Sequence, residues 1–159
     1  MCIRDSRQVT DLLYTGRVDV SAESTQVVVG FAGAFGMARD GAGVGGSVAV
    51  NVVSNRIESY LINSKVTHSG AATGNHDVNV SASDKTTLVA ITGAAGAGKK
   101  AGVGIAVSYN EIGNAVMAGI QGSTVDTKGH GAVNISAEDT SSLGGGAVGV
   151  GVGLSLIHI

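Results

Sequence analysis

The sequence predicts an all-β fold, a parallel β-helix in which strands stack along one axis. Apolar residues alternate with other residues at a period of two, as in β-strands. The segment beginning at Val18 returns at Val78 and again at Val133. The chain has 26 glycines and no proline, which suits strands joined by tight corners. A repeat of this length indicates stacked units, each covering the apolar face of its neighbour.

The repeat divides the chain into copies. Residues 43–66 return at 102–125, 59 positions later. We predict a solenoid fragment over 7–153, with copies at about 18–77, 78–132 and, truncated, 133–153. One copy holds about six short strands, which is natural for two or three coils. We therefore expect right-handed coils of roughly 20 residues each.

The two ends of the chain do not belong to this repeat. Residues 1–6 read MCIRDS and residues 154–159 read LSLIHI. They can be encoded by DNA strings that are reverse complements over most of their length. These strings look like a sequencing adapter translated on both strands, so we interpret both ends as adapter scars and exclude them. We accordingly expect the chain to be an internal fragment of a longer protein.

The strands follow in the same order in each copy. In the first, Val18, Val20 and Ala22 share one face, and Asp19 points the other way. A later strand alternates Ile57, Ser59 and Leu61 with a solvent-facing set. The predicted strands centre on residues 18–22, 48–50, 57–61, 66, 78–82, 107–109, 116–120, 125 and 133–137; the solvent-facing set is Arg56, Glu58 and Tyr60.

Glycine and asparagine mark the corners and the seams between strands. They tolerate positive φ, so we place corners at 54–55, 63–64 and 68–76 and at the equivalent positions of the next copy. Stacking would form amide ladders, which satisfy stacked turns. The glycine and alanine tracts would be flat walls where only small side chains fit. The ladder candidates are Asn51 with Asn110 and Asn55 with Asn114, and the tracts are 30–46, 93–104 and 144–153.

One segment nearly matches a phosphate-binding loop. Residues 93–100 read GAAGAGKK and follow a strand-like stretch. The loop would need Ser or Thr where Lys100 stands, and no helix pattern follows. The equivalent segment 33–40 lacks the Gly-Lys pair. We therefore expect a glycine-rich wall and no nucleotide.

Other motifs are explained by the repeat. Asn79 and Asn134 open Asn-x-Ser glycosylation sequons on outward-facing positions. His76 and His130 occupy similar corners without a second ligand at a fixed spacing, so we expect solvated turn residues and no metal. We identify no catalytic constellation, cofactor site or thiolate site, because Cys2, the only cysteine, lies in a scar.

Charge and hydropathy exclude some partners. The net charge is −2 and no basic run occurs, so nothing indicates nucleic-acid binding. The apolar stretch 143–153 is shorter than the roughly 20 residues of a spanning helix. We therefore expect no membrane span in this fragment.

The repeated patterns Gly-Val-Gly-x-(Ala/Ser)-Val-x-x-Asn at 43–51 and 102–110 and Val-x-(Val/Ile)-Ser-Ala at 78–82 and 133–137 have a familiar form. With Ser-x-Val at 64–66 and 123–125, they resemble the repeats of leukotoxin-family filamentous adhesins and related autotransporter passengers. The resemblance covers nearly all of residues 8–153. It implies a long secreted β-helix displayed on the bacterial outer-membrane surface, and it brings no catalytic residues.

The resemblance and the redundancy of the repeat predict a structural and adhesive role, not an enzyme. The segment would act as a rigid stalk and binding surface. Its partners would be host-cell or matrix ligands and the neighbouring repeats of the parent chain. A cytotoxic or biofilm-matrix exoprotein segment is the first alternative. A polysaccharide-degrading β-helix enzyme is the second, although charges here are few and scattered.

Overall fold

The computed structural model describes residues 10–70 and 74–153, so both predicted scars lie outside the described residues. The described chain is all-β and contains no helix, which confirms the predicted class. Ten strands follow one another: β1 Thr10–Tyr14, β2 Val18–Ala38, β3 Ala42–Val53, β4 Arg56–Ile62, β5 Ser64–His68, β6 Val78–Gly98, β7 Ala101–Ile112, β8 Ala115–Gln121, β9 Thr124–Asp126 and β10 Val133–Gly153.

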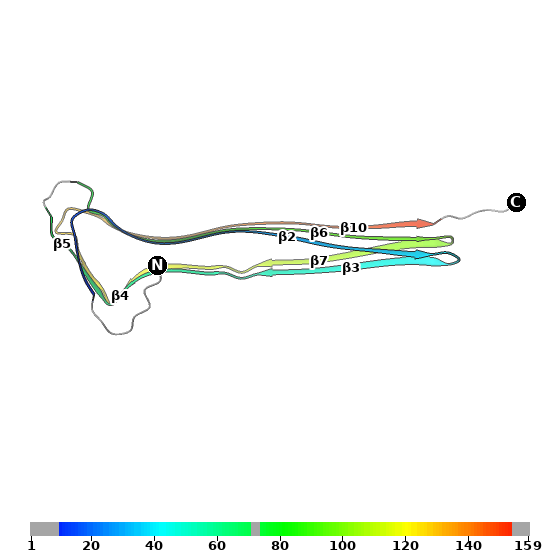
Figure 1. Ribbon diagram of the computed structural model, residues 1–159, viewed down its shortest axis with the longest axis horizontal. Coiled ribbons are helices and arrows are strands. Elements are labelled where there is room, and N and C mark those ends of the chain that lie inside the picture. The colour runs from blue at the N-terminus through cyan, green and yellow to red at the C-terminus, as the bar shows by residue number, and fades with distance from the viewer. Residues whose placement is uncertain (1–9, 71–73, 154–159) are drawn as a thin grey trace. The chain divides into compact units, whose positions relative to one another are not determined.

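Strands pair between copies of the repeat, not within a copy. The sheets have the orders β1-β5-β9, β10-β6-β2, β3-β7 and β4-β8. β3 and β7 are parallel and in register from Ala42 opposite Ala101 to Val53 opposite Ile112. Figure 1 shows β2, β6 and β10 side by side, with β3 and β7 forming a second pair. Equivalent residues therefore lie beside one another, as the repeat predicts.

The strand registers do not confirm the predicted coil length of roughly 20 residues. Asn51 lies opposite Asn110, 59 positions further along the chain. The registers of β1 with β5, β4 with β8 and β5 with β9 also span about one whole copy. None of them sets residues about 20 positions apart side by side, so a coil of that length has no support. The smallest stacking unit in these registers is one copy of the repeat.

The strands are longer than predicted because the glycine and alanine tracts continue them. β2, β6 and β10 each have 21 residues. The chain reverses after β2 at residues 39–41 and after β6 at residues 99–100. At this turn the Lys99 ammonium pairs with Asp40 of the preceding copy at 3.1 Å. The tracts are thus strand ends on both sides of a tight turn.

The corners use positive φ where the sequence predicts it. Asn63 has a φ of 48° and Gly122, in the equivalent corner, has a φ of 60°. Lys128 and Gly129 adopt positive φ in the turn that precedes β10. Asparagine and glycine reach this region most readily, which explains their place at 63 and 122.

The described chain forms two compact units, each built from all three copies. The first comprises residues 10–25, 55–85 without 71–73, and 114–140. Its apolar core centres on Tyr14, Val66 and Val78, with Val18, Leu61 and Val125 packed around them. On β4 the predicted solvent face is confirmed, since Arg56, Glu58 and Tyr60 alternate with buried or half-buried residues.

The second unit comprises residues 26–54, 86–113 and 141–153. Within it, the later parts of β2, β6 and β10 face β3 and β7. The layers are so close that a Cβ added at Gly45 would collide with the Ala95 carbonyl, and one at Gly104 with that of Ala94. Beside these glycines the inward-facing residues are glycine, alanine and small polar residues, whereas the larger Leu88 and Val53 are buried further along the same unit.

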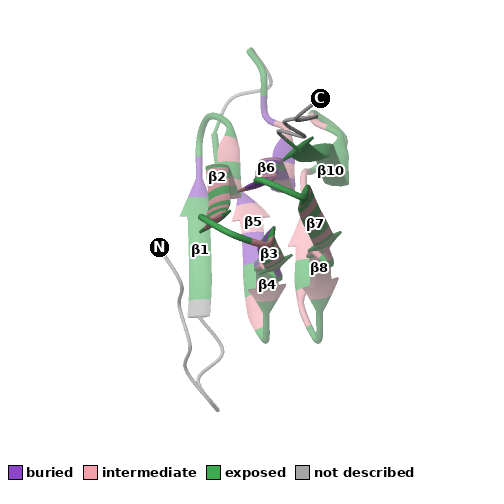
Figure 2. Cartoon of the chain, turned by 90° about the vertical axis from the view of Figure 1, so that its right-hand side faces the viewer, coloured by how far each residue is buried: buried purple, intermediate pink, exposed green. Residues whose placement is uncertain are grey.

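Position within the sheet decides which strand is buried. β6 lies between β2 and β10, and alternate residues along it are buried. β10 has one partner and is exposed along its whole length (Figure 2). A further parallel strand could pair with the outer edge of β10.

Candidate functional site

In the second unit an amide pair links β3 to β7. The Asn51 side chain donates from Nδ2 to Oδ1 of Asn110 at 2.9 Å. Asn110 in turn donates to the Ser108 hydroxyl at 2.9 Å. Both asparagines are half-buried, so each hydrogen bond satisfies a polar group that would otherwise have no partner between the layers.

Glycines on the facing sheet make room for this pair. A Cβ at Gly30 would lie 2.7 Å from Oδ1 of Asn51, and a Cβ at Gly145 would lie 2.9 Å from Nδ2 of Asn110. Each amide therefore sits against a backbone that has no side chain. Nearby, the Ser47 hydroxyl donates to the Gly93 carbonyl at 2.9 Å and ties the two layers together.

The second pair of candidates lies in the first unit and bonds differently. Asn55 donates through its backbone N–H to Oδ1 of Asn114 at 3.1 Å. The Asn114 amide then donates to the Asp84 carboxylate at 2.6 Å. Asp84 is only 2% exposed, although an aspartate is usually found on the surface. Its even-numbered position on β6, shared with buried residues, was the signal that it points inward.

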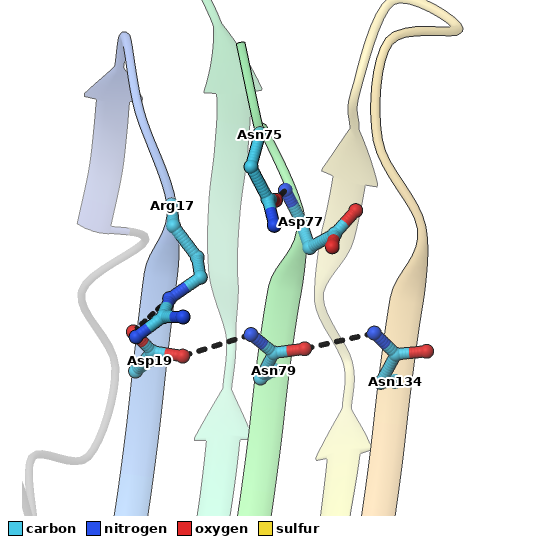
Figure 3. A network of polar contacts seen from close by, with 6 residues as sticks. All are labelled: Arg17, Asp19, Asn75, Asp77, Asn79 and Asn134. Atoms are coloured by element: carbon cyan, nitrogen blue, oxygen red, sulfur yellow. Dashed lines mark hydrogen bonds and ion pairs between the residues drawn. The ribbon is translucent and has the colours of Figure 1, made fainter.

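A third ladder lies on the exposed side of the first unit (Figure 3). Asn134 donates to Oδ1 of Asn79 at 2.8 Å, and Asn79 donates to Oδ1 of Asp19 at 2.8 Å. Arg17 donates to the other Asp19 oxygen at 2.6 Å. The ladder is directional, because every amide donates toward Asp19 and presents its oxygen toward β10.

These contacts have two chemical consequences. The hydrogen bond from Asn79, followed by that from Arg17, lowers the pKa of Asp19 below its ordinary value of 3.8. The two glycosylation sequons begin at ladder residues Asn79 and Asn134. A glycan on Asn79 would attach to the nitrogen that donates to Asp19, so modification and this rung would compete.

The outer faces of the second unit carry large apolar side chains. On β2, Phe31, Phe35 and Met37 are 76%, 64% and 73% exposed. On β3 and β7 the exposed faces are rich in valine and isoleucine, including Val44, Val48, Val50, Val103, Ile105 and Val107. Bulky side chains thus lie on the outer faces opposite the glycine and alanine tracts. Contiguous apolar surface of this kind marks contact with another surface.

The face formed by β2, β6 and β10 is hollowed. Gly33 and Gly93 have no side chains, and Phe35, Val148 and Val150 rise beside them. The hollow is shallow and open, with a volume of about 490 Å³ and a mainly apolar lining. This lining favours contact with an apolar group over a charged ligand.

The structure corrects the sequence prediction for one of the two corner histidines. His76 is 2% exposed and is not a solvated turn residue, whereas His130 is exposed, as predicted. His68, at the end of β5, is 3% exposed. The ring centroids of His68 and His76 are 4.1 Å apart, and that of His130 is 6.1 Å from His68. The stacked corners that end β5 and precede β6 and β10 bring them together. The signal was the similar place of His76 and His130 in successive copies.

The segment that resembled a phosphate-binding loop is strand. Residues 93–98 complete β6, so they do not form a loop of converging N–H groups. Among the described residues, no group of three or more His, Cys, Asp or Glu side chains is arranged to hold a metal ion. In that same part of the chain, no helix has the length and apolar character needed to cross a membrane.

Comparison with known proteins identifies no related protein. No protein-family model, curated protein or solved structure matches this chain.

Proposed function

We propose that the chain is a segment of a rigid stalk with adhesive faces, part of a large secreted protein displayed on a bacterial surface. In this proposal the strands close into a right-handed β-solenoid whose coils continue into neighbouring repeats of the parent chain. The ligands are host-cell or matrix components that present apolar surface.

The observation that carries the proposal is the pairing of like with like. Asn51 lies opposite Asn110, Val44 opposite Val103 and Val48 opposite Val107. Identical units stacked by parallel pairing produce length and stiffness, because each new unit adds the same contacts. An active site instead needs one unit to differ sharply from the others.

The apolar outer faces support the adhesive part. Burying them in water-free contact would stabilise a complex by roughly 25 cal/mol for each Å² covered. Their repetition on successive strands would present the same contact many times, and such multivalent contact strengthens weak binding.

The test measures adhesion of the whole chain to cultured host cells and to immobilised matrix proteins. The variant Phe31→Ser with Phe35→Ser and Met37→Ser removes apolar bulk from one exposed face and leaves the layer interior unchanged. We expect at least a several-fold loss of binding. The matched control is Tyr60→Ser, which removes an exposed ring from β4 and should bind as the wild type does.

The outcomes separate the proposal from its alternatives. Absence of binding by the wild type, together with full adherence of bacteria whose parent protein lacks these repeats, would reject adhesion. Release of shortened chains from anionic polysaccharides would instead favour an enzyme. Lysis of the cultured cells by the chain would favour the cytotoxic alternative.

A further inference from the structure

The outer face that β2, β6 and β10 form in the second unit is apolar and uncharged over its described length. Its exposed large side chains are Val27, Val29, Phe31, Phe35 and Met37 on β2, Ile91 on β6, and Val148, Val150 and Val152 on β10. The outer face of β3 and β7 differs, because it carries the exposed carboxylate of Glu111, which accepts from the Tyr109 hydroxyl at 2.7 Å.

Basic side chains border the uncharged face at one end. The turn after β2 contains Arg39 and Asp40, the turn after β6 contains Lys99 and Lys100, and all four are exposed. The Lys99 ammonium pairs with Asp40 at 3.1 Å, so the two turns lie side by side (Figure 1). Three cations and one carboxylate give the paired turns a net charge of +2.

An apolar face with basic groups at its border has the chemistry of a lipid-binding surface. Helices that lie on membranes combine an aromatic and aliphatic face with lysine and arginine, and a sheet can present the same groups. The long stems of Arg39 and Lys100 can lie along apolar surface while their charged ends reach phosphate groups. A fluid acyl layer can also fill the shallow hollow at Gly33 and Gly93 without having a complementary shape.

We propose that this face docks on the surface of a bilayer that contains anionic phospholipids, with the two turns at the headgroups. The inference rests on the adhesive role proposed above, because it names the surface to which the apolar face adheres. The sheet lies on the bilayer and does not cross it. β2 and β10 each pair with one strand of the described chain, so the backbone groups of their outer edges need water or headgroups as partners.

The test measures flotation of the whole chain with lipid vesicles in a density gradient. One set of vesicles contains equal parts of phosphatidylcholine and phosphatidylserine, and the other contains phosphatidylcholine alone. We expect the chain to float with the anionic vesicles and to bind the neutral ones at least several-fold more weakly. Added salt should weaken binding to the anionic vesicles, because it screens the attraction between the turns and the headgroups.

Charge variants test the role of the turns. Arg39→Gln with Lys100→Gln removes two cations and leaves the ion pair between the turns in place. Binding to the anionic vesicles should fall by about fivefold for each cation removed, whereas binding to the neutral vesicles should change little. Lys65→Gln with Lys128→Gln removes the same charge from exposed positions in the first unit and should bind as the wild type does.

Apolar variants test which face docks. Phe35→Ser with Met37→Ser removes apolar bulk beside the turns and should weaken binding to both sets of vesicles. Val48→Ser with Val107→Ser changes the face of β3 and β7 and should leave vesicle binding unchanged. All four side chains are exposed, so both variants should keep the circular dichroism of the wild type.

The outcomes separate this inference from the proposed function. Adhesion to immobilised matrix proteins without flotation would overturn the lipid inference and leave the adhesive role standing, whereas absence of both would reject both. Equal binding to neutral and anionic vesicles, or equal losses in the charge variant and its control, would also overturn the inference. So would self-association without lipid that Phe35→Ser with Met37→Ser abolishes, because a second copy would then cover the face.

Discussion

At the scale of single residues, the Asn51–Asn110 pair is held by its environment as much as by its own bond. The facing glycines 30 and 145 leave space for the two amides, because a Cβ at either glycine would lie within 3 Å of an amide atom. The pair therefore offers a direct measure of how much one such hydrogen-bonded pair contributes to the free energy of unfolding.

We predict that Asn51→Ala and Asn110→Ala each lower the free energy of unfolding by about 1 to 3 kcal/mol, because each leaves a half-buried partner unsatisfied. The double variant should lose less than the sum, with a coupling of about 0.5 to 1 kcal/mol. Urea unfolding of the four proteins measures this cycle. Val50→Ala, on the exposed face of β3, should change stability little and serves as the control. Strict additivity would show that the rung contributes nothing.

A second residue-scale prediction concerns Asp19. Its folded pKa is lowered, so its contribution to stability is present above pH 3.8 and is lost as the pH falls through the folded value. Asn79→Ala removes the main cause, and the Asp19 pKa should rise toward 3.8. Carbon-detected NMR titration of the carboxyl group measures it. Asn134→Ala, one rung further away, should leave the pKa nearly unchanged; an equal rise in both variants would contradict the assigned cause.

At the scale of the strand, close packing of the two layers makes neighbouring glycines unequal. On β3, a Cβ at Gly45 would collide with the Ala95 carbonyl, whereas one at Gly46 would lie 4.0 Å from the Ile105 carbonyl. We predict that Gly45→Ala destabilises the fold by about 1 to 3 kcal/mol or more through overpacking. Gly46→Ala should be neutral or stabilise by up to about 1 kcal/mol, because it restricts the unfolded chain. Thermal and urea unfolding of both variants would show the difference, and equal effects would argue against close layer packing.

Strand pairing was predictable from the sequence, but strand length was not. The 59-residue spacing of Asn51 and Asn110 leads directly to their parallel register. The glycine and alanine tracts show too little alternation of apolar and polar residues to indicate whether they continue a strand or form a separate segment. Which face is interior was equally hidden on β2, because Phe31 and Val29 alternate with apolar Ala32 and Val28. The close packing of the two layers, which the sequence alone does not report, keeps the set that contains Phe31 on the outer face.

The buried positions in the first unit illustrate the same limit. His68, His76 and Asp84 are polar, so residue type predicts exposure for each of them. Their burial arises from stacking of corners and strands that lie far apart in the sequence. The repeat places His76 and His130 in similar corners, but their approach to His68 depends on how those corners stack.

At the scale of the molecule, β2 and β10 each pair with one other strand of the described chain, and their outer edges are open there to end-to-end association. Such contacts are heterologous and can continue into filaments. In the register that sets Asn79 beside Asp19, the next molecule would set its Asp19 beside Asn134. Asn134 already donates to Asn79 and presents its oxygen outward. The carboxylate of Asp19 would meet that oxygen with no proton between them.

We therefore predict that the wild-type chain associates only at high concentration and that Asp19→Asn strengthens association. The new amide can donate to Asn134, and the repulsion between acceptors disappears. One such hydrogen bond, at about 1 kcal/mol, should shift the midpoint of association to a roughly fivefold lower concentration. Glu23→Gln removes the same charge from an exposed position on β2 outside the ladder and controls for net charge. Sedimentation velocity over a wide concentration range distinguishes the three proteins. If all three remain monomeric, or if both variants associate equally, the directional ladder does not govern stacking between molecules.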